Sequence, residues 1–256
     1  MPDDVARVVA LGASNLTRGF ATVVSTSRAA WGPDVEVLAA LGHGRSYGAH
    51  SRLAYCRRLP GILESGLWQE LTSRPRRPTR ALVTDVGNDI LYGYSAEQTL
   101  AWVAEALRRL TAFTDDVVLT DLPLASIRRL SNLKFLAFRS VLVPSCRLPL
   151  GEVLDRAERV NHGLARLSAR FGATLFRLDP AWYGFDPMHV RPSLSRRAWQ
   201  QILGAPPAAS AAARAAALES FRLHLLRPER RWLFGVEQFT PQTGVALPLG
   251  GRVWLF

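Results

Sequence analysis

The residues best suited to chemistry are a serine near the start of the sequence and a carboxylate with a histidine far along it. Ser14 follows the apolar run 8–11, and Asp186 stands three residues before His189 in a segment rich in proline and glycine. At this spacing in a tight loop, the carboxylate can accept a hydrogen bond from one ring nitrogen. The other nitrogen is then free to take a proton from a serine hydroxyl. Together the three side chains are typical of nucleophilic catalysis.

Each of these residues also has a simpler structural explanation. Ser14 or Asn15 could cap the helix predicted over residues 17 to about 30, and a lone histidine is commonly a surface residue. Of the five histidines, however, only His189 has a carboxylate at this spacing in a loop that follows a predicted strand. Ligands of open α/β sheets bind beyond the carboxyl ends of the strands, so Ser14 is also well placed for catalysis.

A second strand end carries a loop rich in glycine, residues 41–48. It does not match the dinucleotide motif G-x-G-x-x-G, because Tyr47 stands where the third glycine is needed. Glycine also lets a backbone N–H approach a developing negative charge closely. Gly42 and Gly44 compete for this role, and we choose Gly44. We expect Gly42 and His43 to line the same site as Ser14.

A side-chain amide follows the third predicted strand, residues 81–86. Asn88 could donate from its amide to an oxyanion at the carboxyl end of that strand. An Asx-type turn explains the same residues and, taken alone, is the better explanation. If the amide does face the site, Asp89 and Asn15 are expected to line it as well.

The order of strands and helices predicts an α/β fold. The chain has 256 residues, of which 48% are hydrophobic, enough for one large domain or one domain with an appendage. Apolar runs predict five strands, at residues 8–11, 35–40, 81–86, 117–122 and 173–178. Helices are expected between and after them, at residues 17–30, 49–71 (with breaks at Pro60 and Gly66), 95–110, 127–141, 150–171 and 193–203. Such alternation indicates a parallel sheet covered on both faces.

Taken in order, Ser14, the glycine loop, Asn88 and the Asp186/His189 pair resemble the four sequence blocks of the SGNH, or GDSL-type, hydrolase superfamily. The resemblance spans roughly residues 5–204. It implies a three-layer α/β/α sandwich with a five-stranded parallel sheet. It also implies hydrolysis of a small acyl ester through an acyl-enzyme on Ser14, with no metal and no cofactor. The oxyanion would be held by the amides of Ser14 and Gly44 and by the Asn88 side chain.

The sequence departs from the family pattern at several positions. Ala13 stands where the family has an aspartate before the serine, and Val86 stands in place of the first glycine of the third block. No G-x-S-x-G motif is present, which argues against the nucleophile elbow of the α/β-hydrolases. The departures leave two alternatives open: an acyltransferase that uses the same serine, or an inactive binding protein with the same fold.

Charge and cysteine content limit the partners. Lys+Arg number 32 and Asp+Glu 21, a net charge of +11, but the one dense arginine cluster, residues 73–80, has no aromatic residues among it. We therefore expect a solvated basic surface and no nucleic-acid partner. Cys56 and Cys146 lack metal-ligand spacing and are expected to be reduced thiols. With no leader and no run long enough to span a bilayer, a cytoplasmic protein is expected.

Residues 205–256 lie beyond the resemblance. An alanine-rich helix is predicted over residues 208–226, and short strands at 232–234 and 253–256 flank a turn at 248–251. Because this extension is strongly apolar, we expect it to pack on the catalytic domain, residues 1–204. Packing on a second subunit, which would make a homo-oligomer, is the alternative.

Overall fold

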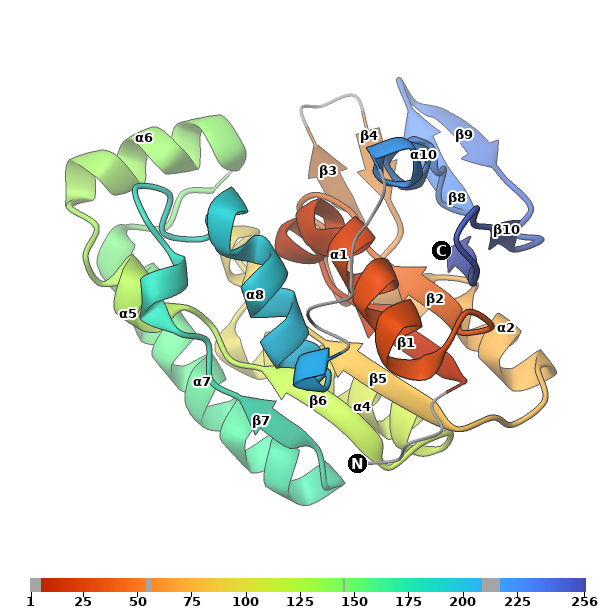
Figure 1. Ribbon diagram of the computed structural model, residues 1–256. Coiled ribbons are helices and arrows are strands. Elements are labelled where there is room, and N and C mark those ends of the chain that lie inside the picture. The colour runs from red at the N-terminus through yellow and green to blue at the C-terminus, as the bar shows by residue number, and fades with distance from the viewer. Residues whose placement is uncertain (1–5, 54–56, 145, 209–216) are drawn as a thin grey trace.

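The computed structural model describes residues 6–53, 57–144, 146–208 and 217–256. Its centre is a seven-stranded sheet in the order β10-β11-β2-β1-β5-β6-β7 (Figure 1). All neighbouring strands are parallel except β10 and β11. The strands are β1 (Arg7–Leu11), β2 (Glu36–Ala40), β5 (Thr79–Val83), β6 (Asp116–Thr120), β7 (Thr174–Phe176), β10 (Val245–Ala246) and β11 (Arg252–Leu255). The predicted α/β fold with a parallel sheet is confirmed.

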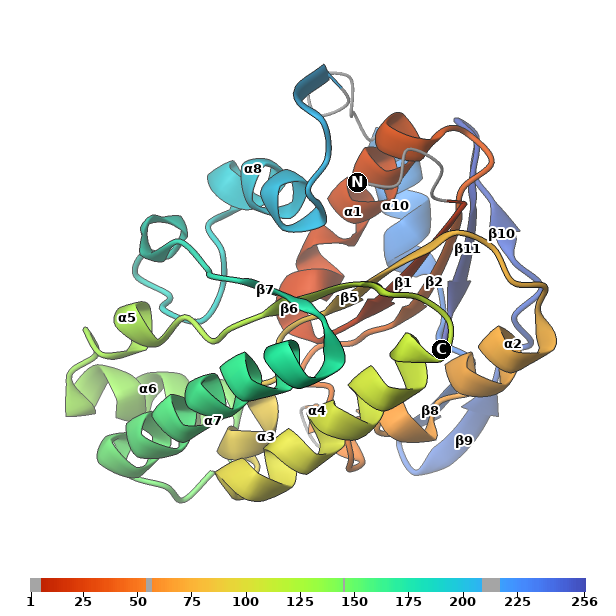
Figure 2. The ribbon, with the colours of Figure 1, turned by 90° about the horizontal axis from the view of Figure 1, so that it is seen from below.

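Helices cover both faces of this sheet (Figure 2). One face carries α1 (Ser14–Trp31), α8 (Pro192–Leu203) and α10 (Ala217–Leu225), and the other carries α2 (Leu67–Ser73), α4 (Ala96–Thr111) and α7 (Leu150–Phe171). Along β1, Val8 and Ala10 belong to the core on the side of α1 and α8. Val9 and Leu11 belong to the core on the opposite side, with α4 and α7. This double burial explains why β1 has no polar alternation.

Local capping residues fix two of the long helices where the sequence predicts them. The Ser95 hydroxyl accepts a hydrogen bond from the Gln98 amide at the start of α4. Gly172, with a φ of 67°, ends α7 in the left-handed region that favours glycine. The remaining short helices are η1 (Ile62–Glu64), α3 (Asn88–Leu91), α5 (Leu124–Ile127), α6 (Asn132–Leu142) and η2 (Pro180–Trp182).

The helix predicted over residues 49–71 is wrong for most of its length. This segment forms β3 (Ser51–Leu53), β4 (Arg57–Leu59) and η1 before α2 begins. A second, antiparallel sheet runs in the order β3-β4-β8-β9, where β8 is Arg230–Leu233 and β9 is Val236–Phe239. Because β4 pairs with a strand about 175 residues away in sequence, its conformation depends on tertiary pairing rather than on local pattern.

The C-terminal extension contributes strands to both sheets. β11 pairs with β2 in parallel, Val253 opposite Val37, so the parallel part of the central sheet has six strands instead of the expected five. The burial of the C-terminal extension is uneven, because its residues Phe221 and Phe234 are 60% and 79% exposed. The middle of the predicted helix 208–226 lies outside the described residues. A domain boundary at residue 204 and a homo-oligomer formed through the extension stay predictions.

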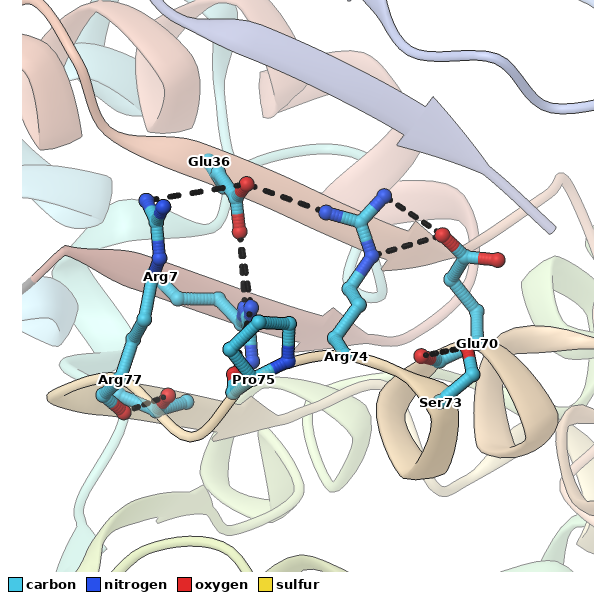
Figure 3. Close-up of polar contacts among 8 residues, drawn as sticks. Arg7, Glu36, Glu70, Ser73, Arg74, Pro75 and Arg77 are labelled. Carbon is cyan, nitrogen blue, oxygen red and sulfur yellow. Dashed lines mark hydrogen bonds and ion pairs between the residues drawn. The ribbon is translucent and has the colours of Figure 1, made fainter.

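An ion cluster joins the amino-terminal ends of β1 and β2, opposite the ends that carry the candidate site (Figure 3). Glu36 accepts from Arg7 at 3.0 Å and from Arg74 at 3.1 Å, and Arg74 also contacts Glu70. The Arg7 side chain is only 3% exposed. Within the arginine cluster, Arg80 is buried and pairs with Asp116, and Arg74 is half-buried and pairs with Glu36 and Glu70, which differs from the solvated surface expected there.

Two further expectations concern membranes and thiols. In the described ranges, no helix combines the length and the hydropathy that crossing a bilayer requires. Cys146 is a buried free thiol, whereas Cys56 lies outside the described residues.

We predict that Glu36→Gln lowers the free energy of unfolding by about 3 kcal/mol, because it leaves buried guanidinium groups without their carboxylate. Urea denaturation followed by circular dichroism measures the change. The control is Glu237→Gln, which removes an exposed carboxylate paired with Arg230 and should cost less than about 1 kcal/mol. Equal effects of the two substitutions would contradict the prediction.

Candidate active site

Ser14 is the first residue of α1 and follows β1 after two residues, at the carboxyl edge of the sheet. The N-cap of α1 is Ala13, whose own side chain makes no capping hydrogen bond. The Ser14 hydroxyl therefore does not serve as the cap that its position alone would allow. Asn15 is also not a cap: its amide donates to Asp85 and to the Met188 carbonyl, and its oxygen accepts from the Val190 amide.

Ser14, His189 and Asp186 form a continuous chain of hydrogen bonds. Ser14 Oγ lies 2.9 Å from His189 Nε2, and His189 Nδ1 lies 2.7 Å from Asp186 Oδ2. The other carboxylate oxygen of Asp186 accepts from the amides of Met188 and His189. These amide bonds fold the loop back on itself, so the three-residue spacing places carboxylate and ring side by side.

The electrostatics of the pair favour an ionised Asp186. Burial alone would raise the pKa of this carboxyl, but hydrogen bonds from the His189 ring and from the backbone amides outweigh it and lower the pKa below its usual value. With the carboxylate charged, His189 carries its proton on Nδ1, and Nε2 accepts from the Ser14 hydroxyl. This arrangement can transfer the serine proton to the ring.

Three candidate hydrogen-bond donors lie at the cavity that Ser14 lines. Gly44 and Asn88 line the same cavity as the serine. Among the residues that the structure describes, the amides of Ser14 and Gly44 have no protein acceptor. Gly44 has a φ of 67°, and an added Cβ would lie 2.7 Å from the Tyr92 hydroxyl, so this position requires glycine. The Asn88 amide is oriented by a long contact of 3.5 Å with the Arg45 carbonyl.

Of the residues expected to line the site, Asn15 and His43 do so. Burial, followed by the charges of Arg57 and Arg18, lowers the pKa of His43 to about 4. His43 is therefore neutral at neutral pH and adds no positive charge next to His189.

Gly42 and Asp89 lie away from the cavity lining, contrary to expectation. An added Cβ at Gly42 would lie 2.3 Å from Leu59 Cδ1, so this glycine permits close packing behind the loop. Asp89 is fully buried and accepts from the Tyr47 amide at 3.1 Å. Burial raises its pKa to about 6. Both residues support the glycine loop from inside the molecule.

Asp85 is a site residue that the sequence patterns do not reveal. One of its carboxylate oxygens accepts from the amides of Ala13 at 2.9 Å and Leu16 at 3.0 Å, and the other accepts from Asn15 at 3.0 Å. Its φ of 58° is unusual for a residue other than glycine. A carboxylate at the start of a helix satisfies unpaired amides and favours the positive end of the helix dipole. The clue in the sequence is Ala13: because alanine cannot cap the helix, a residue elsewhere in the chain must accept from its first amides, and Asp85, just after β5, does so.

Arg45 connects the glycine loop to the C-terminal extension. It is fully buried, and its guanidinium donates to the Pro60 carbonyl and to the main-chain oxygen of Phe256. Burial and the charge of Arg57 lower the pKa of Arg45 to about 9. Since Arg45 directly follows Gly44, the end of β11 fixes the backbone beside the site.

The cavity next to Ser14 measures about 220 Å³. The polar residues that line it include Ser14, Asn15, His43, Asn88 and His189. Apart from Arg139 of α6, most of the remaining wall is apolar and comes mainly from α3, α5, α6 and α7: Ile90, Leu91, Leu122, Pro123, Ile127, Leu130, Phe135, Phe138, Val143, Val153 and Ala157. Such a cavity suits an apolar chain whose reactive group lies at the serine. Within the described part of the chain, no group of three or more His, Cys, Asp or Glu residues could hold a metal ion.

The sequence matches no protein-family model and no curated protein. The fold is similar to that of an inhibitor-bound aryl esterase from M. smegmatis, with a TM-score of 0.51, 11% identity, and coverage of 78% of this chain and 97% of that one. Esterase EstA from Pseudoalteromonas sp. gives a TM-score of 0.48 at 11% identity, with coverage of 78% and 96%. A member of the lipolytic protein G-D-S-L family from Veillonella parvula gives 0.46 at 10% identity, with coverage of 77% and 94%.

At these identities the likeness is one of fold. The solved structures of similar fold thus include two esterases and one member of the lipolytic G-D-S-L family.

Proposed function

We propose that this protein is a serine hydrolase that cleaves carboxylic esters through an acyl-enzyme on Ser14. The observation that carries the proposal is the hydrogen-bonded chain from Ser14 Oγ through His189 to Asp186, at 2.9 and 2.7 Å. The esterase neighbours of the fold support the same reaction class.

The reaction proceeds in two halves. His189 Nε2 takes the hydroxyl proton as Ser14 Oγ attacks the ester carbonyl, and the same proton then passes to the departing alcohol. Water next attacks the acyl-enzyme, with His189 again as the base, and releases the acid and the free serine. Asp186 stabilises the imidazolium that forms in each half without taking its proton.

The negative charge on the carbonyl oxygen needs donors that are already in place. The amides of Ser14 and Gly44 and the Asn88 side chain supply them in this proposal. The loss of one such donor typically costs about 3 to 4 kcal/mol of transition-state stabilisation. The hydrogen bonds of Arg45 to Pro60 and Phe256 and of the Tyr92 hydroxyl to the Gly44 carbonyl hold the glycine loop in place, so the Gly44 amide need not reorganise during the reaction.

Two rival functions share the fold, and product analysis separates them. An acyltransferase would give acyl product on an added alcohol in preference to the free acid. An inactive binding protein would leave Ser14 unlabelled by a fluorophosphonate, because only an activated serine reacts. For a hydrolase we expect labelled Ser14, free acid as the main product, and no requirement for an acceptor alcohol.

Ser14→Ala should abolish release of p-nitrophenol from acetate and butyrate esters, a loss of at least about a thousandfold in kcat/KM. The control is Ser193→Ala, which removes an exposed serine hydroxyl on α8 and should leave the rate unchanged. Circular dichroism checks that both variants fold. Turnover at the wild-type rate in Ser14→Ala would refute the proposal.

Asp186→Asn should lower kcat by about a thousandfold or more with little change in KM, because the carboxylate acts mainly on the charged ring formed in the transition state. Stopped-flow or steady-state assays with p-nitrophenyl butyrate measure both constants. A variant as active as the wild type would mean that another group orients His189.

Asp85→Gly should lower kcat by about 10- to 100-fold, whereas Asp85→Asn should have a smaller effect, since one side-chain oxygen can still accept from the first turn of α1. Glycine and asparagine both tolerate the left-handed backbone, so the comparison isolates the accepting side-chain oxygen at this position. Asp34→Asn, at an exposed turn, is the control. Asp85 is a positioning residue in this proposal, and a loss of thermal stability with unchanged kcat would show a merely structural role.

A further inference from the structure

Helix α6 has apolar side chains on two sides. Phe135 and Phe138 line the cavity beside Ser14. Leu133 and Leu136, in contrast, are 78% and 46% exposed. Phe185, which is 79% exposed, lies against this helix, with its ring 5.6 Å from that of Phe138. We call Leu133, Leu136 and Phe185 the lid surface.

The lid surface stands at the outer edge of the molecule. Figure 1 shows α6 at one side of the fold, beyond α5 and away from the central strands. Phe138 lies between the lid surface and the cavity, because it contacts the exposed Phe185 and also lines the cavity. An apolar chain lying on the lid surface is therefore only one aromatic side chain away from the cavity that ends at Ser14.

The segment of the chain that carries α6 has charged residues of one sign. Between Asp121 and Glu152 the sequence contains no acidic residue, but it contains five basic residues: Arg128, Arg129, Lys134, Arg139 and Arg147. Lys134, the only lysine of the chain, lies 5.6 Å from the Phe185 ring centroid.

Most of these basic residues have no carboxylate partner in the part of the chain that the structure describes. Arg128 pairs with Glu158, whereas the other four basic residues form no ion pair in the described ranges. The arginine cluster near Glu36 is different, because there carboxylates neutralise the guanidinium groups (Figure 3).

These features determine which partner fits. A second copy of this chain would bring the same positive segment against its own, so charge opposes self-association through the lid surface. An anionic lipid layer offers hydrocarbon for the exposed leucines and phenylalanine, together with negative headgroups for the surrounding cations. Each lysine or arginine near such a layer contributes about 1 kcal/mol, in addition to the burial of apolar area.

We propose that the lid surface binds the surface of an anionic lipid layer and admits acyl chains from it to the cavity. The inference rests on the proposed ester hydrolysis for its substrate, a lipid ester, but the binding itself requires no catalysis. Arg129, Lys134 and Arg147 contact the headgroups, and Leu133, Leu136 and Phe185 enter the acyl region.

Binding is tested with the Ser14→Ala protein and sedimenting vesicles of phosphatidylcholine alone or with a quarter phosphatidylglycerol. We expect the protein to bind the anionic vesicles, with an affinity at least tenfold lower at high salt. The double substitution Leu133→Ser/Leu136→Ser should also lower this affinity at least tenfold. The matched control is Leu218→Ser/Leu225→Ser, which alters two leucines of α10 that are each 59% exposed. Lys134→Glu should also weaken binding.

The activity of the proteins with Ser14 intact separates the two proposals. Leu133→Ser/Leu136→Ser should hydrolyse p-nitrophenyl acetate at the wild-type rate but lose at least tenfold of the rate on a lipid ester presented in anionic vesicles. Failure to bind any vesicle, equal binding to neutral vesicles, or a dimer that this double substitution dissociates would overturn the inference. Binding without hydrolysis of either ester would refute the proposed function and support the lid surface.

Discussion

The site depends on how the first turn of α1 satisfies its backbone amides. A helix leaves its first amides without partners, and here Ala13 offers no side chain for them. Asp85 reaches across from the end of β5 to accept from two of these amides and from Asn15. Asn15 in turn holds the backbone on both sides of His189. One carboxylate thus fixes the serine and, through one amide side chain, the histidine loop.

Much of the fold follows from local patterns, because buried parallel strands and long capped helices leave strong periodic signals. β1, α4 and α7 are predictable in this way, and the residues at the ends of β1 and β5 can be placed at one edge of the sheet. β4 is not predictable, since only its pairing with β8 makes residues 57–59 a strand.

The site residues also divide into those that local sequence patterns predict and those that depend on tertiary pairing. Ser14, Asp186 and His189 could be chosen from residue type and spacing in the sequence, and the structure places them within hydrogen-bond reach. Asp85 could not, because its role requires the register of β1 against β5, with Leu11 opposite Val83. The sequence neighbours of Gly42 and Asp89 suggest that these two residues line the site, but both lie away from the cavity and towards the interior of the molecule.

The bond between Arg45 and Phe256 has a consequence for the order of folding, because 211 residues separate its partners. A chain emerging from the ribosome completes β1, β2 and the glycine loop early, yet the buried guanidinium of Arg45 gains this acceptor only after residues 252–256 have been synthesised. Contacts of such sequence separation form slowly, because a long loop must close first. A partly translated chain thus carries its serine and histidine without this support for the glycine loop, so maturation of the candidate site coincides with completion of the sheet.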